Sequence, residues 1–347
     1  MNKESSPLSA SKVKTLQSCS WLYWAKYHLK LPEDSNDGAN RGTICHLVFE
    51  CLGNPRHKKH YNKILKGNST WKSKAVKRLV LIHAKKLKVY DLENLNLINE
   101  MILNGIKYDF FGTEQGRPTK AVSEEAFNIM VDEDEKKYHI RGFIDKLFLY
   151  KKKSKALIRD FKTSKKVFSG QEKTDNLQDL MYSLAVKKIY PEFMSRQSEF
   201  LFLKFDLEKD MLGNKGEGVV EMAEISDEEL DGFEIFLTEI QSIVDEFTLS
   251  DAESNLAAKQ EYPKDGSFGG PLSCGFAKYP GQLKKDGNKM WHCPHKFSYK
   301  YWRIKSKEGK TISCHFTEDA AKKAAQDEDS ITEEFYKGCP HWNKDEI

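Results

Sequence analysis

The sequence predicts an α/β fold in which a mixed β-sheet is flanked by helices, with a Cys/His-rich extension at its C-terminal end. The first observation is a change of hydrophobic period: apolar residues recur at helical spacing up to about residue 110 and alternate as in strands from Ala121 onward. The second is that helical and strand-like segments then follow one another, which is typical of a sheet with helices on its faces. The third is a change of composition after Glu261, where Gly, Pro, Cys, His and Trp replace most aliphatic residues.

The N-terminal third is predicted to be helical, because its apolar residues fall on one side of each segment. Ser11 can cap the first helix. The segment that starts at Gly42 places His46 and Glu50 one turn apart. The expected helices cover residues 8–31, 42–52, 72–90 and 92–109.

Three strands joined by short charged turns are predicted next, as an antiparallel meander over residues 121–131, 138–150 and 156–162. A helix over 177–189, which Pro191 ends, leads to a fourth strand over 199–205. Ser226 then caps an acidic amphipathic helix. This helix and the later hairpin and short helix are expected at residues 226–248, 297–304, 311–316 and 317–326.

These changes of pattern divide the chain into four predicted parts. They are an N-terminal helical region with Cys19, His46 and a basic stretch (1–115), a core (116–210), an acidic helical segment (211–265) and a Cys/His-rich metal-binding tail (266–347). The tail has too few aliphatic residues to form a convincing core by itself, so it is expected to depend on the main domain or on a metal.

Charge is distributed unevenly, although the net charge is only +4. Residues 54–90 contain twelve Lys/Arg and no Asp or Glu, whereas residues 221–253 contain twelve Asp/Glu and no Lys or Arg. Two solvated helical faces are the simple explanation. A long basic stretch also suits a phosphate backbone, because neutralised phosphates release counterions. The candidate phosphate contacts, expected to bind DNA, are Lys72, Lys74, Lys77 and Arg78.

The N-terminus lacks the apolar stretch of a secretory signal, and no run approaches the roughly 20 apolar residues of a membrane span. We therefore expect a cytoplasmic protein with no membrane association. In a reducing compartment, the seven cysteines are better interpreted as thiols or metal ligands than as disulfides.

Two carboxylates and a lysine are predicted to meet at one edge of the sheet. Asp160 and Lys162 lie two apart near the end of the third strand, so they point to the same side. Asp145 on the second strand can reach the same space if the two strands are neighbours. Such a group suits a divalent cation with a bound water, whose pKa the metal lowers. Asp-x-Lys alone is usually surface charge, but the apolar residues around it indicate a buried strand, where charges need partners.

Four segments in chain order resemble motifs of the RecB-type nucleases of the PD-(D/E)XK superfamily. Gly42-Thr43-Ile44-Cys45-His46 resembles the family's Gly-x-x-x-His helix, and Arg141-Gly142-Phe143-Ile144-Asp145 resembles its Gly-x-x-Asp strand. Asp160-Phe161-Lys162 resembles its Asp-x-Lys, and Gln178-Asp179-Leu180-Met181-Tyr182 its Gln-x-x-x-Tyr helix. Each motif is weak by itself, but the order of all four is specific. The resemblance covers residues 9 to about 205 and implies a restriction-endonuclease-like core.

The resemblance also implies roles for these residues. The Mg²⁺ or Mn²⁺ ligands would be His46, Asp145, Asp160 and the backbone carbonyl of Phe161, with an additional acid on the first strand, for which Glu125 is preferred to Glu124. The groups that assist catalysis or brace the site would be Lys162, Gln178 and Tyr182, beside the two aspartates Asp145 and Asp160.

Cys19 precedes an aromatic segment that resembles the N-terminal cysteine motif of the family's iron–sulfur members, which include AddB and the CRISPR-associated exonucleases. These hold a [4Fe–4S] cluster with one early and three late cysteines. The implied ligands here are Cys19, Cys274, Cys293 and Cys339. This sequence departs from the pattern, since Ser20 replaces the usual proline and the late spacing is not compact.

Zinc and free thiols remain alternatives for the tail. Suitable zinc ligands are His292, Cys293, His295, Cys339 and His341. Cys314 is a fourth late candidate for the cluster, but it is not preferred because it alternates within a strand-like run. Cys45 and Cys51 lie on an apolar helix face and are expected to be packing residues.

Taken with the resemblance, the residues predict a DNA exonuclease that hydrolyses phosphodiester bonds in single strands or at duplex ends, in DNA repair or recombination. A non-catalytic DNA-binding scaffold subunit is the alternative, although the intact Asp145, Asp160 and Lys162 argue against it. A nuclease that works only with a separate helicase or recombination protein is a further possibility, because the chain has no Walker-type phosphate loop.

Overall fold

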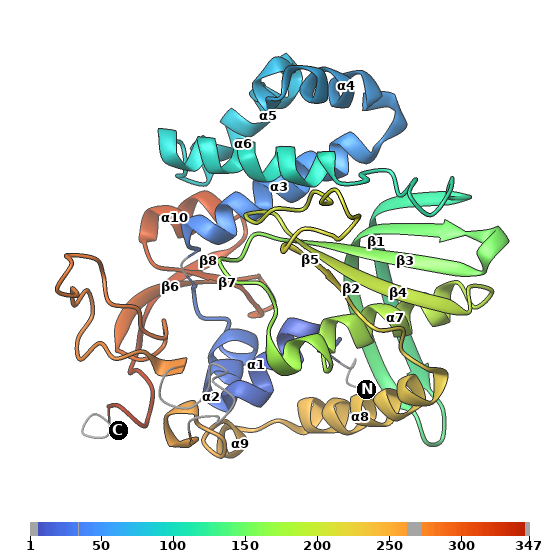
Figure 1. Ribbon diagram of the computed structural model, residues 1–347. Helices are drawn as coiled ribbons and strands as arrows, with labels where there is room; N and C mark the ends of the chain where they lie inside the picture. Colours follow the sequence, from blue (N-terminus) through green and yellow to red (C-terminus); the bar gives the residue numbers. More distant parts are fainter. Residues whose placement is uncertain (1–5, 34, 262–272, 344–347) are drawn as a thin grey trace. The chain divides into compact units, whose positions relative to one another are not determined.

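The computed structural model describes residues 6–33, 35–261 and 273–343, and it has the mixed α/β architecture that the sequence predicts (Figure 1). The chain forms two compact units. Unit 1 comprises residues 1–10 and 35–241, and unit 2 comprises residues 11–34 and 242–347. The four predicted parts follow the chain in order, whereas each compact unit combines stretches that are far apart in sequence.

Unit 1 is built on a five-stranded sheet with the order β1-β2-β3-β4-β5. Its strands are β1 (Lys120–Asp132), β2 (Lys137–Tyr150), β3 (Lys155–Lys162), β4 (Ser195–Phe202) and β5 (Val219–Glu221). The pair β3–β4 is parallel and the other pairs are antiparallel. A parallel pair needs a crossover, and α7 (Leu177–Ile189) supplies it. The predicted meander and crossover helix are confirmed, whereas the three-residue β5 has no sequence signal of its own.

Most of the other helices of unit 1 begin at a side chain that caps them, and the helix Lys58–Gly67 is the exception. These other helices are α3 (Asp37–Gly53), α4 (Lys58–Gly67), α5 (Lys74–Lys86), α6 (Leu92–Lys107) and α8 (Asp227–Glu246), the last of which runs into unit 2. Asn36 accepts a hydrogen bond from the backbone N–H of Ala39, so α3 begins five residues before the predicted start at Gly42. Helix α4 was not predicted from the sequence.

A hydrophobic core joins α3 to the sheet. The rings of Phe49 on α3 and Phe161 on β3 pack with centroids 4.2 Å apart, and both side chains are buried. Ile98 and Ile102 on α6 complete this cluster from the other side of α3. In Figure 1, α4, α5 and α6 are grouped around α3, and α7 lies on the opposite side of the sheet. Burial of this apolar surface fixes α3, and therefore His46, relative to β2 and β3.

Unit 2 contains a three-stranded antiparallel sheet with the order β7-β6-β8. Its strands and helices are β6 (Tyr299–Lys305), β7 (Thr311–His315), β8 (Ser330–Tyr336), α2 (Ser20–Tyr23), a π-helical turn (Trp24–His28), α9 (Leu249–Ala252), α10 (Glu318–Ala324) and, apart from Ala10, α1 (Ala10–Ser18). The prediction of one continuous helix over residues 8–31 is therefore wrong. Helix α1 ends at Ser18, and the chain continues as the short helix α2 and the π-helical turn. The strand β8 was not predicted.

The early and late stretches of unit 2 share one small core. Ala25 and Leu31 pack with Tyr301, Cys314 and Tyr336. The indole N–H of Trp21 donates to the hydroxyl of Tyr336 at 2.7 Å. The tail therefore packs with the early stretch 11–34 within unit 2. No helix among the residues described here has the length and apolar content to cross a membrane.

Short 3₁₀ turns connect several elements of the chain. They cover Pro55–His57, Thr70–Lys72, Lys151–Lys153, Gly170–Lys173 and Ala257–Lys259.

Candidate active site

Asp145 and His46 meet at the edge of the sheet. The antiparallel register of β2 and β3 pairs Lys146 with Arg159, which brings Asp145 next to the end of β3. One carboxylate oxygen of Asp145 accepts a hydrogen bond from the backbone N–H of Phe161 at 2.7 Å. The other lies 3.1 Å from Nδ1 of His46 on α3. The structure thus brings together two of the predicted ligands, from elements separated by about a hundred residues.

Glu124, not Glu125, completes this group. One ligand atom each from His46, Glu124 and Asp145 lie within 4.8 Å of one another, and no other group of this kind is found in the described part of the chain. Glu125 accepts a hydrogen bond from the hydroxyl of Tyr190 instead, at 2.6 Å. Glu124 adopts a left-handed backbone conformation with φ of +54°, which interrupts the regular strand. The predicted preference for Glu125 is corrected, because simple alternation along β1 does not hold at this residue.

A cleft lies beside α3, where this helix closely approaches the segment after β3. A cleft of about 570 Å³ is lined by Ala39, Gly42, Thr43, His46, Leu47, Glu50, Glu124, Asp145 and Thr163. A Cβ atom at Gly42 would come 2.8 Å from Oγ1 of Thr163. Glycine at this position therefore allows α3 to lie against the segment that follows β3.

The carboxylates of the site carry more negative charge than their surroundings neutralise. Burial, together with the charge of Asp145, raises the pKa of Glu124 to about 7. Burial also raises the pKa of Asp160, against the opposing effect of Lys162. Burial would lower the pKa of His46, but the hydrogen bond to Asp145 and its charge raise it overall. A bound cation would relieve this repulsion and displace the protons, so the residues present fit a divalent metal.

Asp160 is held by a network of polar side chains from β3 and α7. Its Oδ1 accepts hydrogen bonds from Nε2 of Gln178 at 2.8 Å and from the hydroxyl of Tyr182 at 3.2 Å. Lys162 donates to Oε1 of Gln178 at 2.6 Å and forms an ion pair with Oδ2 of Asp160 at 2.8 Å. Apart from this ammonium, no donor among the described residues reaches the buried Oδ2. It therefore retains the capacity to bind a cation.

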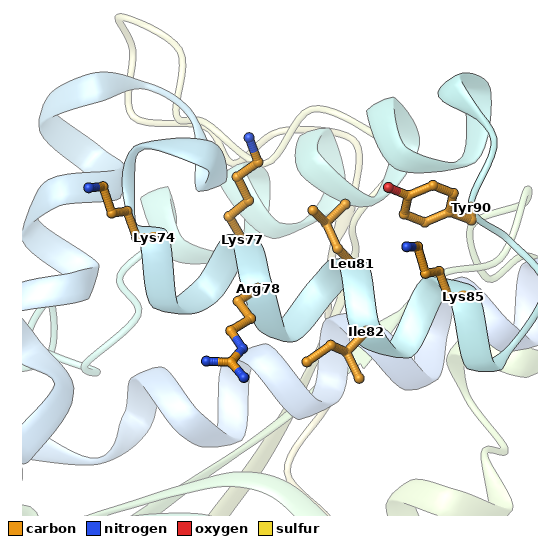
Figure 2. A pocket seen from close by; sticks show the side chains of 7 residues that line it. All are labelled: Lys74, Lys77, Arg78, Leu81, Ile82, Lys85 and Tyr90. Carbon is orange, nitrogen blue, oxygen red and sulfur yellow. The ribbon is translucent and has the colours of Figure 1, made fainter.

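Three of the four predicted DNA contacts lie together on α5. Lys74, Lys77 and Arg78 line a shallow groove of about 560 Å³, shown in Figure 2. Lys72 lies outside this groove, in the 3₁₀ turn before α5, where its side chain packs against Gly67.

The four cysteines Cys19, Cys274, Cys293 and Cys339 gather within unit 2. The backbone N–H of Cys293 donates to the carbonyl of Cys274 at 3.0 Å. Burial raises the pKa of Cys293 to about 12, and the charges of the other three thiols add to the increase. Burial likewise raises the pKa of Cys339 to about 11, with contributions from Cys19 and Cys274.

The remaining cysteines lie elsewhere, whereas the backbones of His295 and His341 hydrogen-bond to Cys293 and Cys339. Cys314 lies in the apolar core of unit 2, and Cys45 and Cys51 lie on α3 in unit 1. Nδ1 of His295 lies 2.8 Å from the hydroxyl of Tyr299, and Nδ1 of His292 lies 3.5 Å from the carbonyl of Met290.

Comparison with known proteins identifies the family. The model of the PD-(D/E)XK nuclease superfamily matches residues 7–269, which is most of the chain. The chain belongs to this superfamily. A solved structure titled "Crystal structure of SSO0001" is 13% identical to this chain, with a TM-score of 0.26; the match covers 66% of this chain and 87% of that chain. No curated protein gives a significant match.

Proposed function

We propose that this protein is a Mg²⁺- or Mn²⁺-dependent deoxyribonuclease that removes nucleotides from single-stranded DNA or from duplex ends. Membership of a nuclease superfamily supports phosphodiester hydrolysis. The observation that carries the proposal is the coincidence of two arrangements at one edge of the sheet. These are the His46–Glu124–Asp145 group and the buried Asp160, whose Oδ2 is contacted by the Lys162 ammonium and by no other donor among the described residues.

The proposed metal ligands are carboxylate oxygens of Asp145, Asp160 and Glu124, with His46 and the carbonyl of Phe161. A divalent ion at this position lowers the pKa of bound water and polarises the phosphate. The ammonium of Lys162, oriented by Asp160 and Gln178, can orient the attacking water or balance negative charge on the phosphate oxygens. Gln178 and Tyr182 position Asp160 rather than contact the phosphate, because both donate hydrogen bonds to the Asp160 carboxylate.

The test is Mg²⁺- or Mn²⁺-dependent cleavage of end-labelled single-stranded DNA. Asp145→Ala, Asp160→Ala and Lys162→Ala are each expected to lower the rate by more than about 100-fold, the upper range for loss of a supporting group around a metal. DNA affinity should remain largely intact. Asp132→Ala, an exposed acid at the end of β1, is the matched control. Wild-type binding without any cleavage would favour a DNA-binding scaffold, and full activity of Asp160→Ala would refute the site.

We also propose that Cys19, Cys274, Cys293 and Cys339 hold a [4Fe–4S] cluster. The charges of Cys19 and Cys274 act on both Cys293 and Cys339, which supports one shared centre for the four thiols. One early and three late cysteines match the pattern of the family's iron–sulfur members, which favours a cluster over a single zinc ion.

A further inference from the structure

The groove on α5 combines cations with exposed apolar side chains. It is lined by Lys74, Lys77, Arg78, Leu81, Ile82, Lys85 and Tyr90. Ile82 is 52% exposed and Tyr90 45% exposed, which is unusual for large apolar groups in the middle of a basic surface. Figure 2 shows these side chains following α5 from Lys74 to Lys85, with Tyr90 beside Lys85. The groove therefore offers apolar and cationic groups to one ligand.

The four cations of the groove have no acidic partner. In the residues that the structure describes, the four groove cations form no ion pair with Asp or Glu; they are Lys74, Lys77, Arg78 and Lys85. The helix begins with no acid in its first turn, and the surrounding stretch 54–90 contains none at all. A surface of unpaired cations attracts a polyanion, and its field is strongest where several cations line one depression.

Tyr90 presents an aromatic ring next to a cation. The Nζ of Lys85 lies over this ring, 4.8 Å from its centroid. A ring of this kind can stack with a nucleobase, while the adjacent ammonium contacts a phosphate. Leu81 and Ile82 lie one turn of α5 or less from Lys85, so apolar contacts for neighbouring bases are available along the same helix.

We propose that this groove binds single-stranded DNA, with bases against Leu81, Ile82 and Tyr90 and phosphates at Lys74, Lys77, Arg78 and Lys85. The inference rests on the proposed nuclease function and specifies its substrate. Duplex DNA keeps its bases stacked inside, so it can use the cations but not the apolar groups. An acidic peptide can use the cations too, but it has no repeated flat face for Tyr90.

The groove lies next to the element that carries the active site. The side-chain amide of Asn40 on α3 donates to the carbonyl of Leu87, at the C-terminal end of α5, at 3.0 Å. Gly42 and Thr43, less than one turn further along α3, line the active-site cleft. The C-terminal end of α5, the helix that carries most of the groove, is thus bonded to the turn of α3 that precedes the cleft.

The experiment measures binding by fluorescence anisotropy, with labelled oligo(dT) and an abasic oligonucleotide of equal length as probes. All proteins carry Asp160→Asn, so that the probe is not cut. Tyr90→Ala is expected to weaken oligo(dT) binding at least about fivefold, since stacking of a base on an aromatic ring is worth ~1–3 kcal/mol. Its effect on the abasic probe should stay below about twofold. Ile82→Ser should act in the same direction.

Salt dependence separates the cations from the apolar groups. Lys77→Ala with Arg78→Ala should reduce the log–log salt slope by about 1.4, at ~0.7 per phosphate contact for single strands. Tyr90→Ala should leave the slope unchanged. The controls are Lys86→Ala, an exposed lysine of α5 that does not line the groove, and Leu212→Ser, an 88% exposed leucine elsewhere in unit 1. Both should bind like the parent protein.

Several results would overturn the proposal. Equal losses for Tyr90→Ala on oligo(dT) and the abasic probe would exclude base stacking. A duplex or an oligo-glutamate peptide that binds as tightly as oligo(dT), and is weakened equally by Tyr90→Ala, would show a non-selective polyanion surface. These results concern binding alone. Failure of the nuclease assignment would appear separately, as undiminished cleavage by the Asp160→Asn protein.

Discussion

Substitution of Cys19 by serine tests whether a metal centre joins the two ends of unit 2. Cys19 and Cys293 are about 270 residues apart in the chain, and unit 1 is inserted between them. For a cross-link that closes a loop of this length, the chain-entropy model gives an upper limit of about 5–6 kcal/mol at 25 °C. Contacts such as Trp21 with Tyr336 also hold the early and late stretches of unit 2 together. We therefore expect a loss of about 3–5 kcal/mol.

The assay is thermal unfolding followed by circular dichroism, with metal analysis and a visible spectrum of anaerobically purified protein. The melting temperature of Cys19→Ser should fall by about 5–15 °C. Cys293→Ser should give a similar decrease, and the double variant little more, because both substitutions remove the same centre. A broad visible absorbance that the variants lose would indicate an iron–sulfur cluster, and colourless protein with stoichiometric zinc would indicate the zinc alternative.

Cys51→Ser is the matched control, since this half-buried thiol lies on α3 in unit 1 and should change packing without loss of metal. The reasoning would be refuted if wild type and Cys19→Ser unfolded at the same temperature and neither contained metal. Additive losses in the double variant would also contradict a shared centre, because independent packing defects add.

Two further predictions concern charge. Reversal of Lys72, Lys74, Lys77 and Arg78 to Glu should weaken DNA binding across sequences and reduce the salt slope by up to about 3; an unchanged slope would mean that they form only a solvated face. The pKa of Glu124 in the folded protein is raised to about 7. At pH values between the ordinary pKa of a glutamate and 7, the unfolded chain therefore binds fewer protons than the folded one. Stability without metal should therefore fall as pH rises through this window, and Mg²⁺ should reverse the fall. Glu124→Gln should flatten this dependence in melting curves recorded with EDTA; an unaltered pH profile would contradict a buried, uncompensated Glu124.

Hydrophobic periodicity in the sequence was sufficient to predict several strands and helices of unit 1. Strands β1 to β3 lie within one residue of their predicted bounds, and α7 coincides with its prediction. The pairing of Asp160 with Lys162 follows from strand alternation and is confirmed by their 2.8 Å ion pair. Glu124 could not be found in this way. Its left-handed backbone interrupts the regular strand, and non-glycine residues give little sequence signal for that conformation.

The two compact units were also beyond local patterns. Residues 11–34 pack with the C-terminal stretch because Trp21, Ala25 and Leu31 bury their side chains against β6 and β8. These contacts link residues some 300 positions apart. Hydrophobic periodicity indicates that one face of a segment is buried, but it does not indicate which other segment covers that face. The cysteine motif was the one sequence feature that indicated the connection, through the family resemblance.

The alternation of β3 explains how a strongly charged site can remain ordered. Asp160 faces the proposed metal site, and its neighbour Arg159, which is 1% exposed, points the opposite way. There the guanidinium donates to Oε1 of Glu199 on β4 at 2.7 Å and to the carbonyl of Asp109 at 2.7 Å. A buried pair of this kind contributes little net stability, but removal of one partner is costly, so it fixes the position of β3 between its neighbours. The hydrogen bond from the Phe161 N–H to Asp145 links β3 to β2 at the same level. Asp145 and Asp160 would therefore form a preorganised site if they bind a cation as proposed, because binding energy need not be used to order the ligands.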